Sequence, residues 1–131
     1  MTRTLWIGGV CIALAASALA HAQSTKDPVY RVKDEVVVHG TVTSVKTIPD
    51  WMGKDGVNIA LQTPDALASH VDVATASFLK MLDFPLAVGD DLQLTGCWSQ
   101  AADGSPVFLV HELMKQKVTL NVRDPRGMPL W

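Results

Sequence analysis

The sequence has few aromatic residues, few cysteines and no cluster of one charge. Aromatic residues make up 6% of its 131 positions, so valine and leucine must fill most of a core, which favours a β-rich interior. Lys and Arg number 11 and Asp and Glu number 13, for a net charge of −2. Because duplex nucleic acid is bound mainly through its phosphates, this balance argues against such a partner. The length favours a single domain.

Motifs of the common enzyme classes are also absent. The sequence contains no G-x-S-x-G elbow, no Walker phosphate loop, no H-E-x-x-H zinc motif and no C-x-x-C-H haem motif. Two adjacent acidic pairs, Asp34-Glu35 and Asp90-Asp91, stand at the starts of predicted strands, where we expect solvated carboxylates. We therefore predict that the protein is not an enzyme and needs no cofactor.

Residues 1–22 have the pattern of a cleavable secretory signal peptide. Arg3 is the only charge, an apolar run follows from Leu5 to Leu19, and Ala20-His21-Ala22 supplies a small-x-small cleavage site. The run is shorter than the roughly 20 apolar residues of a membrane span. Lipidation at Cys11 is the weaker alternative, because the residues before it lack the usual lipobox pattern. We expect cleavage near Ala22 and release into the periplasm or the medium.

Without that segment the chain keeps one thiol, Cys97, and cannot form an internal disulfide. In an oxidising compartment a lone cysteine is buried, pairs with another chain, or serves as a ligand or redox thiol. Burial is the simplest of these interpretations.

Hydrophobic periodicity predicts a β domain over 33–124, after a lead-in at 23–32 and before a tail at 125–131. Phe78, Leu79 and Leu82 have the spacing of a short helix within 76–84. Gly40 interrupts the long first strand and marks a bend. Alternating apolar residues indicate strands at 35–48, 57–63, 70–75, 91–98, 107–114 and 117–124. Five strands with a helix between the third and fourth is the order of an OB barrel.

Three blocks carry a resemblance to bacterial exported OB-fold proteins of the BOF type, which are YgiW-like. They are the valine-rich stretch 36–42, the alternating pair 57–61 and 71–73, and the Gly-Asp-Asp-Leu-Gln-Leu-Thr-Gly stretch 89–96. The resemblance implies an all-β, OB-type Greek-key barrel of five to six strands with one short helix between strands 3 and 4. It implies little about the ligand. Cys97 and Trp98 depart from it, since that family has an acidic stretch there.

The tail resembles the ending of exported OB-like proteins, some linked to redox or metal-handling loci and to magnetosomes. It ends in Met128-Pro129-Leu130-Trp131, and exposed Trp and Leu side chains gain nothing from water. We expect the tail to fold back so that Trp131 covers an apolar opening of the barrel. The competing hypothesis is that it docks onto a partner chain.

His39, Cys97 and His111 are the candidate metal ligands, since imidazole and thiolate suit copper, zinc or iron. Their spacing is not diagnostic. We expect the first and fifth strands to be neighbours, with His39 facing outward. His111 shares the parity of Val107 and Leu109 and is expected to point inward, so a site shared by the two histidines needs a bulge.

Trp51 is the strongest candidate for ligand contact, because it lies in the first loop, at the usual rim of OB binding sites. His39 and Trp98 are further candidates, although core packing is the simplest interpretation of Trp98. The sequence thus favours an exported, non-catalytic binding module that contacts a small ligand or a periplasmic protein partner through the barrel rim. The alternative is a periplasmic metal-handling or redox-accessory protein. We expect no membrane span after signal removal, and self-association into a homo-oligomer stays open.

Overall fold

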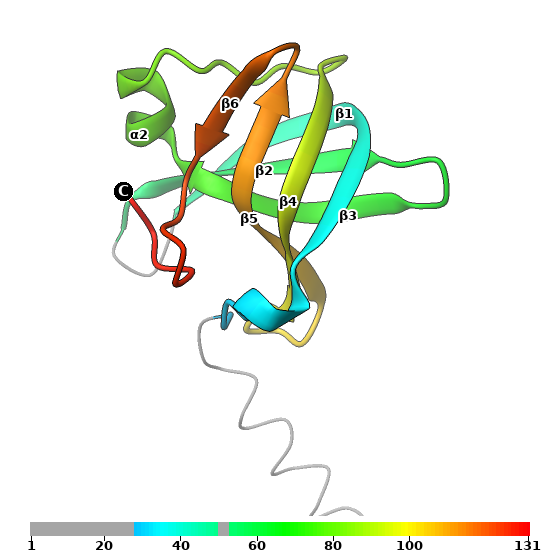
Figure 1. The fold of residues 1–131 in the computed structure, drawn as a ribbon, viewed down its shortest axis with the longest axis vertical. Helices are drawn as coiled ribbons and strands as arrows, with labels where there is room; N and C mark the ends of the chain where they lie inside the picture. The colour runs from blue at the N-terminus through cyan, green and yellow to red at the C-terminus, as the bar shows by residue number, and fades with distance from the viewer. Residues whose placement is uncertain (1–27, 50–52) are drawn as a thin grey trace, which may run out of the picture.

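The computed structural model describes residues 28–49 and 53–131 (Figure 1). The expected signal peptide, the first half of the lead-in and Trp51 lie outside the described residues. The elements in chain order are the 3-10 turn η1 (Val32–Asp34), strands β1 (Val36–Pro49), β2 (Asp55–Gln62) and β3 (Leu67–Thr75), helix α2 (Ala76–Met81), and strands β4 (Asp91–Gln100), β5 (Pro106–Lys115) and β6 (Val118–Asn121).

The strands form one sheet that closes on itself. Their order is β3-β2-β1-β4-β5-β6, and an additional parallel pairing of β3 with β5 closes the first five strands into a barrel. β6 continues the sheet outside the barrel by pairing with β5, and α2 connects β3 to β4. The structure therefore confirms the predicted fold class, an all-β barrel of OB type with one short helix between the third and fourth strands.

The length of β1 allows it to serve both sides of the barrel. Its first half pairs with β4 and its second half with β2, and Thr41 belongs to both registers. Gly40 passes close to the β2 backbone, where a Cβ would collide with the carbonyl of Gln62. A register shift between Val42 and Ser44 follows directly. The close approach of β1 to β2 therefore explains why glycine occupies position 40.

The barrel interior is aliphatic, with Phe108 as its largest fully buried side chain. α2 packs against β2 and β3, where Leu79 is buried and the Thr75 side chain caps the helix by accepting a hydrogen bond from the Phe78 amide at 3.3 Å. The helix ends at Met81, earlier than predicted, and Asp83 then adopts a left-handed conformation with φ of 53°. Among the described residues, none of the helices has the length and apolar character to cross a membrane.

A second, smaller apolar cluster lies on the opposite face of β4 and β5. Cys97, Val107 and Leu109 are buried in it, and Tyr30 from the N-terminal segment packs against them. Phe108 and its alternate neighbours on β5 belong to the interior, so the second cluster lies outside the barrel wall. This outer cluster is where the N-terminal segment docks.

We predict that Gly96→Ala destabilises the protein more than Gly104→Ala. A Cβ at Gly96 would collide with the carbonyl of Leu109 and lie 2.9 Å from the Phe108 ring, whereas a Cβ at Gly104 meets nothing within 4 Å. Overpacking costs about 1–3 kcal/mol or more. Gly104 has φ of 85°, so alanine there carries only a conformational cost of about 1 kcal/mol. Urea unfolding measures both values, and an equal loss in the two variants would contradict the close approach of β4 and β5.

Candidate functional site

A row of side chains crosses the outer face of the barrel at the seam where β3 meets β5. Asn58 on β2 pairs with Asp72 on β3, Asp72 pairs with Leu109 on β5, and Leu109 pairs with Cys97 on β4. Val57, Ile59, Val71 and Val73 are their neighbours along the strands and belong to the interior cluster. The row therefore points away from the barrel core, because successive strand residues alternate between faces.

Segments from both ends of the chain cover this row. On the N-terminal side, the Val29 amide donates to Ser99 Oγ at 3.2 Å and the Arg31 amide donates to Cys97 Sγ at 3.3 Å. On the C-terminal side, the Leu130 amide donates to the Val122 carbonyl at 3.0 Å. Figure 1 shows the C-terminal segment folding back along the barrel.

A tight turn reverses the C-terminal segment. The Asp124 carboxylate accepts hydrogen bonds from the amides of Arg126 and Met128, each at 2.9 Å. Gly127 adopts φ of 88°, and a Cβ there would collide with the Tyr30 ring. An Asx-type turn and a left-handed glycine are the usual means of reversing a chain. The turn brings Pro129 opposite Arg123 in an isolated bridge.

Arg123 is the centre of the covering layer. Only 9% of its surface is exposed, and its guanidinium carbon lies 5.0 Å from the Tyr30 ring centroid and 5.3 Å from that of Trp131. Nη1 donates to the Gly127 carbonyl at 2.8 Å, while Nε has no hydrogen-bond partner among the described residues. Burial lowers the pKa of Arg123, and the Asp72 carboxylate acts in the opposite direction. Two ring contacts and one hydrogen bond thus hold a desolvated cation in place.

Tyr30 also joins a hydrogen-bonded group with Glu35 and His111. The Glu35 carboxylate accepts from the Tyr30 hydroxyl and lies 2.7 Å from His111 Nδ1. The rings of Tyr30 and His111 meet edge to face at 6.1 Å. Burial raises the pKa of Tyr30 above its ordinary value, and the hydrogen bond to Glu35 and its charge add to the effect. The group ties the N-terminal segment to β5.

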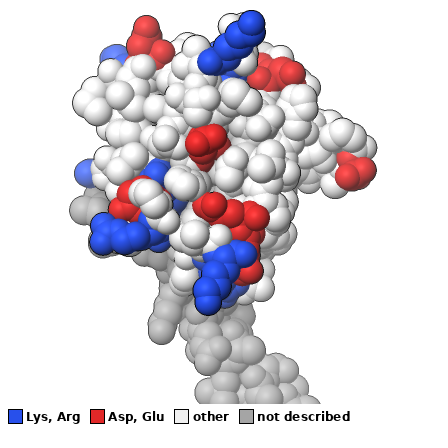
Figure 2. Space-filling view, in the orientation of Figure 1, with Lys and Arg blue, Asp and Glu red and all other residues white. Residues whose placement is uncertain are grey.

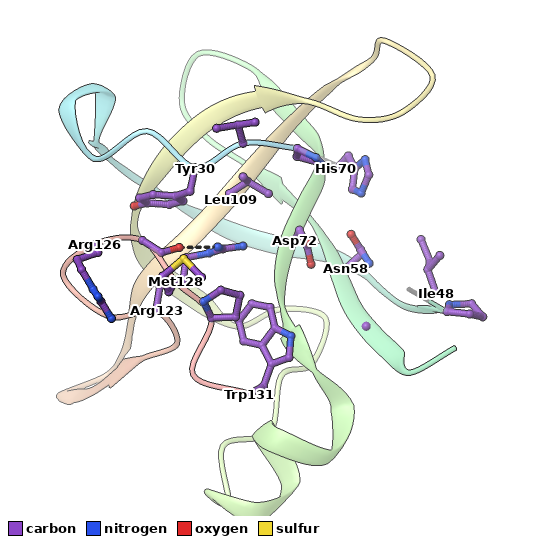
Figure 3. A pocket seen from close by; sticks show the side chains of 16 residues that line it. Tyr30, Ile48, Asn58, His70, Asp72, Leu109, Arg123, Arg126, Met128 and Trp131 are labelled. Atoms are coloured by element: carbon purple, nitrogen blue, oxygen red, sulfur yellow. Dashed lines mark hydrogen bonds between the residues drawn. The ribbon is translucent and has the colours of Figure 1, made fainter. Parts of the chain in front are cut away.

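A cavity of about 670 Å³ lies between the seam and the C-terminal segment (Figure 3). Its volume is in the range of small-molecule pockets. Asn58 is 9% exposed, and its Oδ1 is a second buried polar atom without a partner among the described residues. The polar and aromatic lining side chains are Tyr30, Asn58, His70, Asp72, Arg123, Arg126 and Trp131. The cavity therefore presents the guanidinium groups of Arg123 and Arg126, the Asp72 carboxylate and the rings of Tyr30 and Trp131 to whatever enters it.

The structure does not bring the predicted metal ligands His39, Cys97 and His111 together in one site. β4 lies between β1 and β5, so the expectation that the first and fifth strands are neighbours is wrong. The side chain of His39 is 64% exposed and lies 3.0 Å from the Asp91 carboxylate, whereas Cys97 is fully buried beneath the N-terminal segment. Within 28–49 and 53–131, no three His, Cys, Asp or Glu side chains are grouped to hold a metal ion.

The inward orientation expected for His111 is also wrong. The β4–β5 register passes from Thr95 opposite Glu112 to Gly96 opposite Val110, so His111 lies in a bulge. The expectation assumed that Val107 and Leu109 point inward, but both are buried in the outer cluster, and His111 shares their parity and their side of the strand. His111 instead faces Glu35 on the outer side of the barrel.

Of the predicted ligand contacts, His39 lies outside the cavity lining and Trp51 lies outside the described residues. Trp98 is 44% exposed and meets Phe108 edge to face at 5.2 Å, so core packing is the wrong interpretation of it. Sequence reasoning missed Asn58 and Arg123. Asn58 is a polar residue in an alternating strand, a pattern that normally indicates a solvent-facing side chain.

The charges on the face drawn in Figure 2 are of both signs and interspersed. Blue and red side chains lie close together there. Two of the ion pairs in the structure are Lys115–Asp90 at 3.0 Å and Arg126–Asp124 at 3.1 Å. This face therefore offers no broad surface of one charge.

One family model matches the chain: that of the MamS/MamX magnetosome protein family, over residues 35–120. No curated protein matches. The family match agrees with the magnetosome part of the resemblance seen in the tail, although the match itself covers the barrel and ends before Arg123. The resemblance to BOF-type proteins stays a prediction.

Tyr30 is the only tyrosine of the chain, so its ionisation can be followed by ultraviolet absorbance. An unfolded tyrosine ionises near pH 10. Because the folded pKa is raised, the native state keeps a proton that the unfolded state loses, and we predict that stability falls as pH rises above about 10. Tyr30→Phe should show a smaller fall. Phenolate absorbance appearing near pH 10 while circular dichroism still reports a folded protein would contradict the burial of Tyr30.

Proposed function

This chain belongs to the MamS/MamX magnetosome protein family, and we propose that it is an exported, non-catalytic binding module. Its proposed ligand site is the cavity over the barrel seam, between Asn58 and Arg123. The signal-peptide pattern of residues 1–22 supports export to the periplasm.

One observation carries the proposal: two buried polar side chains with unsatisfied atoms line the same cavity. A buried donor or acceptor without a partner costs about 1–3 kcal/mol. Arg123 Nε is such a donor and Asn58 Oδ1 is such an acceptor. A small molecule with an acceptor at one end and a donor at the other would relieve both costs. A binding role gives these two groups a purpose, since apolar side chains in the same space would not carry this cost.

A non-catalytic role fits the chemistry around the cavity. Cys97 is the one free thiol of the described residues, and it is fully buried. His111 is held by Glu35 and does not line the cavity. Among the described residues that line the cavity there is no serine, threonine, cysteine or lysine, which are common nucleophiles in covalent catalysis.

The alternative of a metal-handling or redox-accessory role receives no geometric support of this kind. Its ligands were His39, Cys97 and His111, and the first is exposed on β1 while the second is sealed in the outer cluster. The cavity, by contrast, brings together residues from β2, β3, β5 and both terminal segments. Binding in the cavity is therefore the function that the geometry supports best.

Asn58→Leu tests the proposal. Leucine has nearly the shape of asparagine and removes the unpartnered oxygen, so we predict that the empty protein gains about 1 kcal/mol of stability while ligand binding falls at least tenfold. Binding is measured by ¹H–¹⁵N NMR titration with hits from a library of small polar fragments, and stability by urea unfolding.

Asn121→Leu is the matched control, because Asn121 is exposed on β6 and does not line the cavity. It should leave fragment binding unchanged. Fragments that bind Asn58→Leu as tightly as the unchanged protein, or a library without hits that shift cavity amides, would refute a ligand site there.

A further inference from the structure

We propose that the cavity takes a small zwitterion of the amino-acid class, with its carboxylate toward Arg123, its ammonium toward Asp72 and an apolar side chain against Trp131. This inference rests on the proposed function, since it assigns a ligand to the same cavity. Three features of the lining carry it: opposite charges from different elements, a fixed guanidinium and apolar walls.

The two charges face the cavity from different parts of the fold. Arg123 belongs to the C-terminal segment and Asp72 to β3, and Figure 3 shows both side chains directed toward the space beside Trp131. Arg126 also lines the cavity but is 3.1 Å from the Asp124 carboxylate. The charges around the cavity therefore nearly balance. A bare anion would lie close to Asp72 and a bare cation close to Arg123, whereas a zwitterion satisfies both without adding net charge.

Arg123 is prepared to receive a carboxylate. The Tyr30 and Trp131 rings and the Gly127 carbonyl fix its position, so little side-chain entropy remains to be lost on binding. Its Nε is without a partner among the described residues. Guanidinium and carboxylate form strong, charge-assisted hydrogen bonds, which are short and directional.

Asp72 is suited to receive the ammonium group. It is half-buried and lies beside Asn58, its register partner on β2, whose Oδ1 is the other unpartnered atom. A carboxylate has several lone-pair sites, so Asp72 can accept from an ammonium in addition to its existing interactions. An ammonium group has three protons, so it can donate to the Asp72 carboxylate and to Asn58 Oδ1 at the same time.

The remaining walls are apolar and select the side chain of the ligand. Ile48, Leu109, Met128 and Pro129 line the cavity together with Trp131. Burial of apolar area stabilises a complex, so an aromatic or branched side chain is preferred to a polar one. Phosphorylated ligands are disfavoured, since a second negative charge would lie near Asp72.

Isothermal titration calorimetry of the purified protein with three matched probes tests this assignment. L-phenylalanine has both charges, phenylpropionate lacks the ammonium and phenethylamine lacks the carboxylate. We expect L-phenylalanine to bind at least tenfold more tightly than either analogue. Asp72→Asn should weaken L-phenylalanine at least tenfold and strengthen phenylpropionate, because it removes both the ammonium acceptor and the repulsion of a bare anion. Arg123→Lys should weaken L-phenylalanine and phenylpropionate alike.

Asp91→Asn is the matched control, since its carboxylate is exposed on β4 outside this cavity, and it should change none of the affinities. Phenylpropionate or phenethylamine binding as tightly as L-phenylalanine would overturn the zwitterion assignment. So would the failure of all three probes. If fragments still shift cavity amides in that case, the proposed binding function stands without this ligand class; if none does, both fail.

Discussion

The layer that covers the barrel seam depends on one buried cation. Arg123 is the residue that both terminal segments contact: Tyr30 meets it from the N-terminal side, and Trp131 and Gly127 meet it from the C-terminal side. Burying a guanidinium carries a desolvation cost, which the lowered pKa of Arg123 reflects. The ring contacts, one carbonyl and the nearby Asp72 offset that cost. Because Arg123 contacts both terminal segments, we expect its removal to loosen the packing of both.

The barrel itself explains why such a layer forms where it does. Closure rests on a short parallel pairing, in which Val71 faces Phe108 and Asp72 faces Leu109. All other neighbours in the sheet are joined by longer antiparallel registers. The terminal segments lie over this short seam and shield its outer face from water. The cavity is the space that remains between seam and cover, so binding chemistry and barrel closure share the same residues.

Sequence patterns predicted the barrel far better than the site. Alternation of apolar residues marks each strand locally, so the strands can be predicted from the sequence alone. Gly40 likewise marks a special position in β1, where the strand passes close to β2. Val107, Leu109 and His111 share one parity, but their pattern does not tell that this side of β5 lies outside the barrel, under the N-terminal segment. Asn58 and Arg123 meet only because β2 and the last segment approach in space. Contacts of this kind depend on how strands far apart in the sequence are paired, and hydrophobic periodicity carries no information on that pairing.

Amide hydrogen exchange in Arg123→Met tests the central claim most directly. Methionine keeps much of the length and apolar contact of the side chain but removes the charge and its hydrogen bond to Gly127. The account predicts that the amides of Arg31 and Leu130, which bond to Cys97 Sγ and the Val122 carbonyl, lose protection together by at least tenfold. Barrel amides such as that of Leu94 should stay protected. Unchanged protection at both terminal amides would contradict the dependence of the covering layer on Arg123.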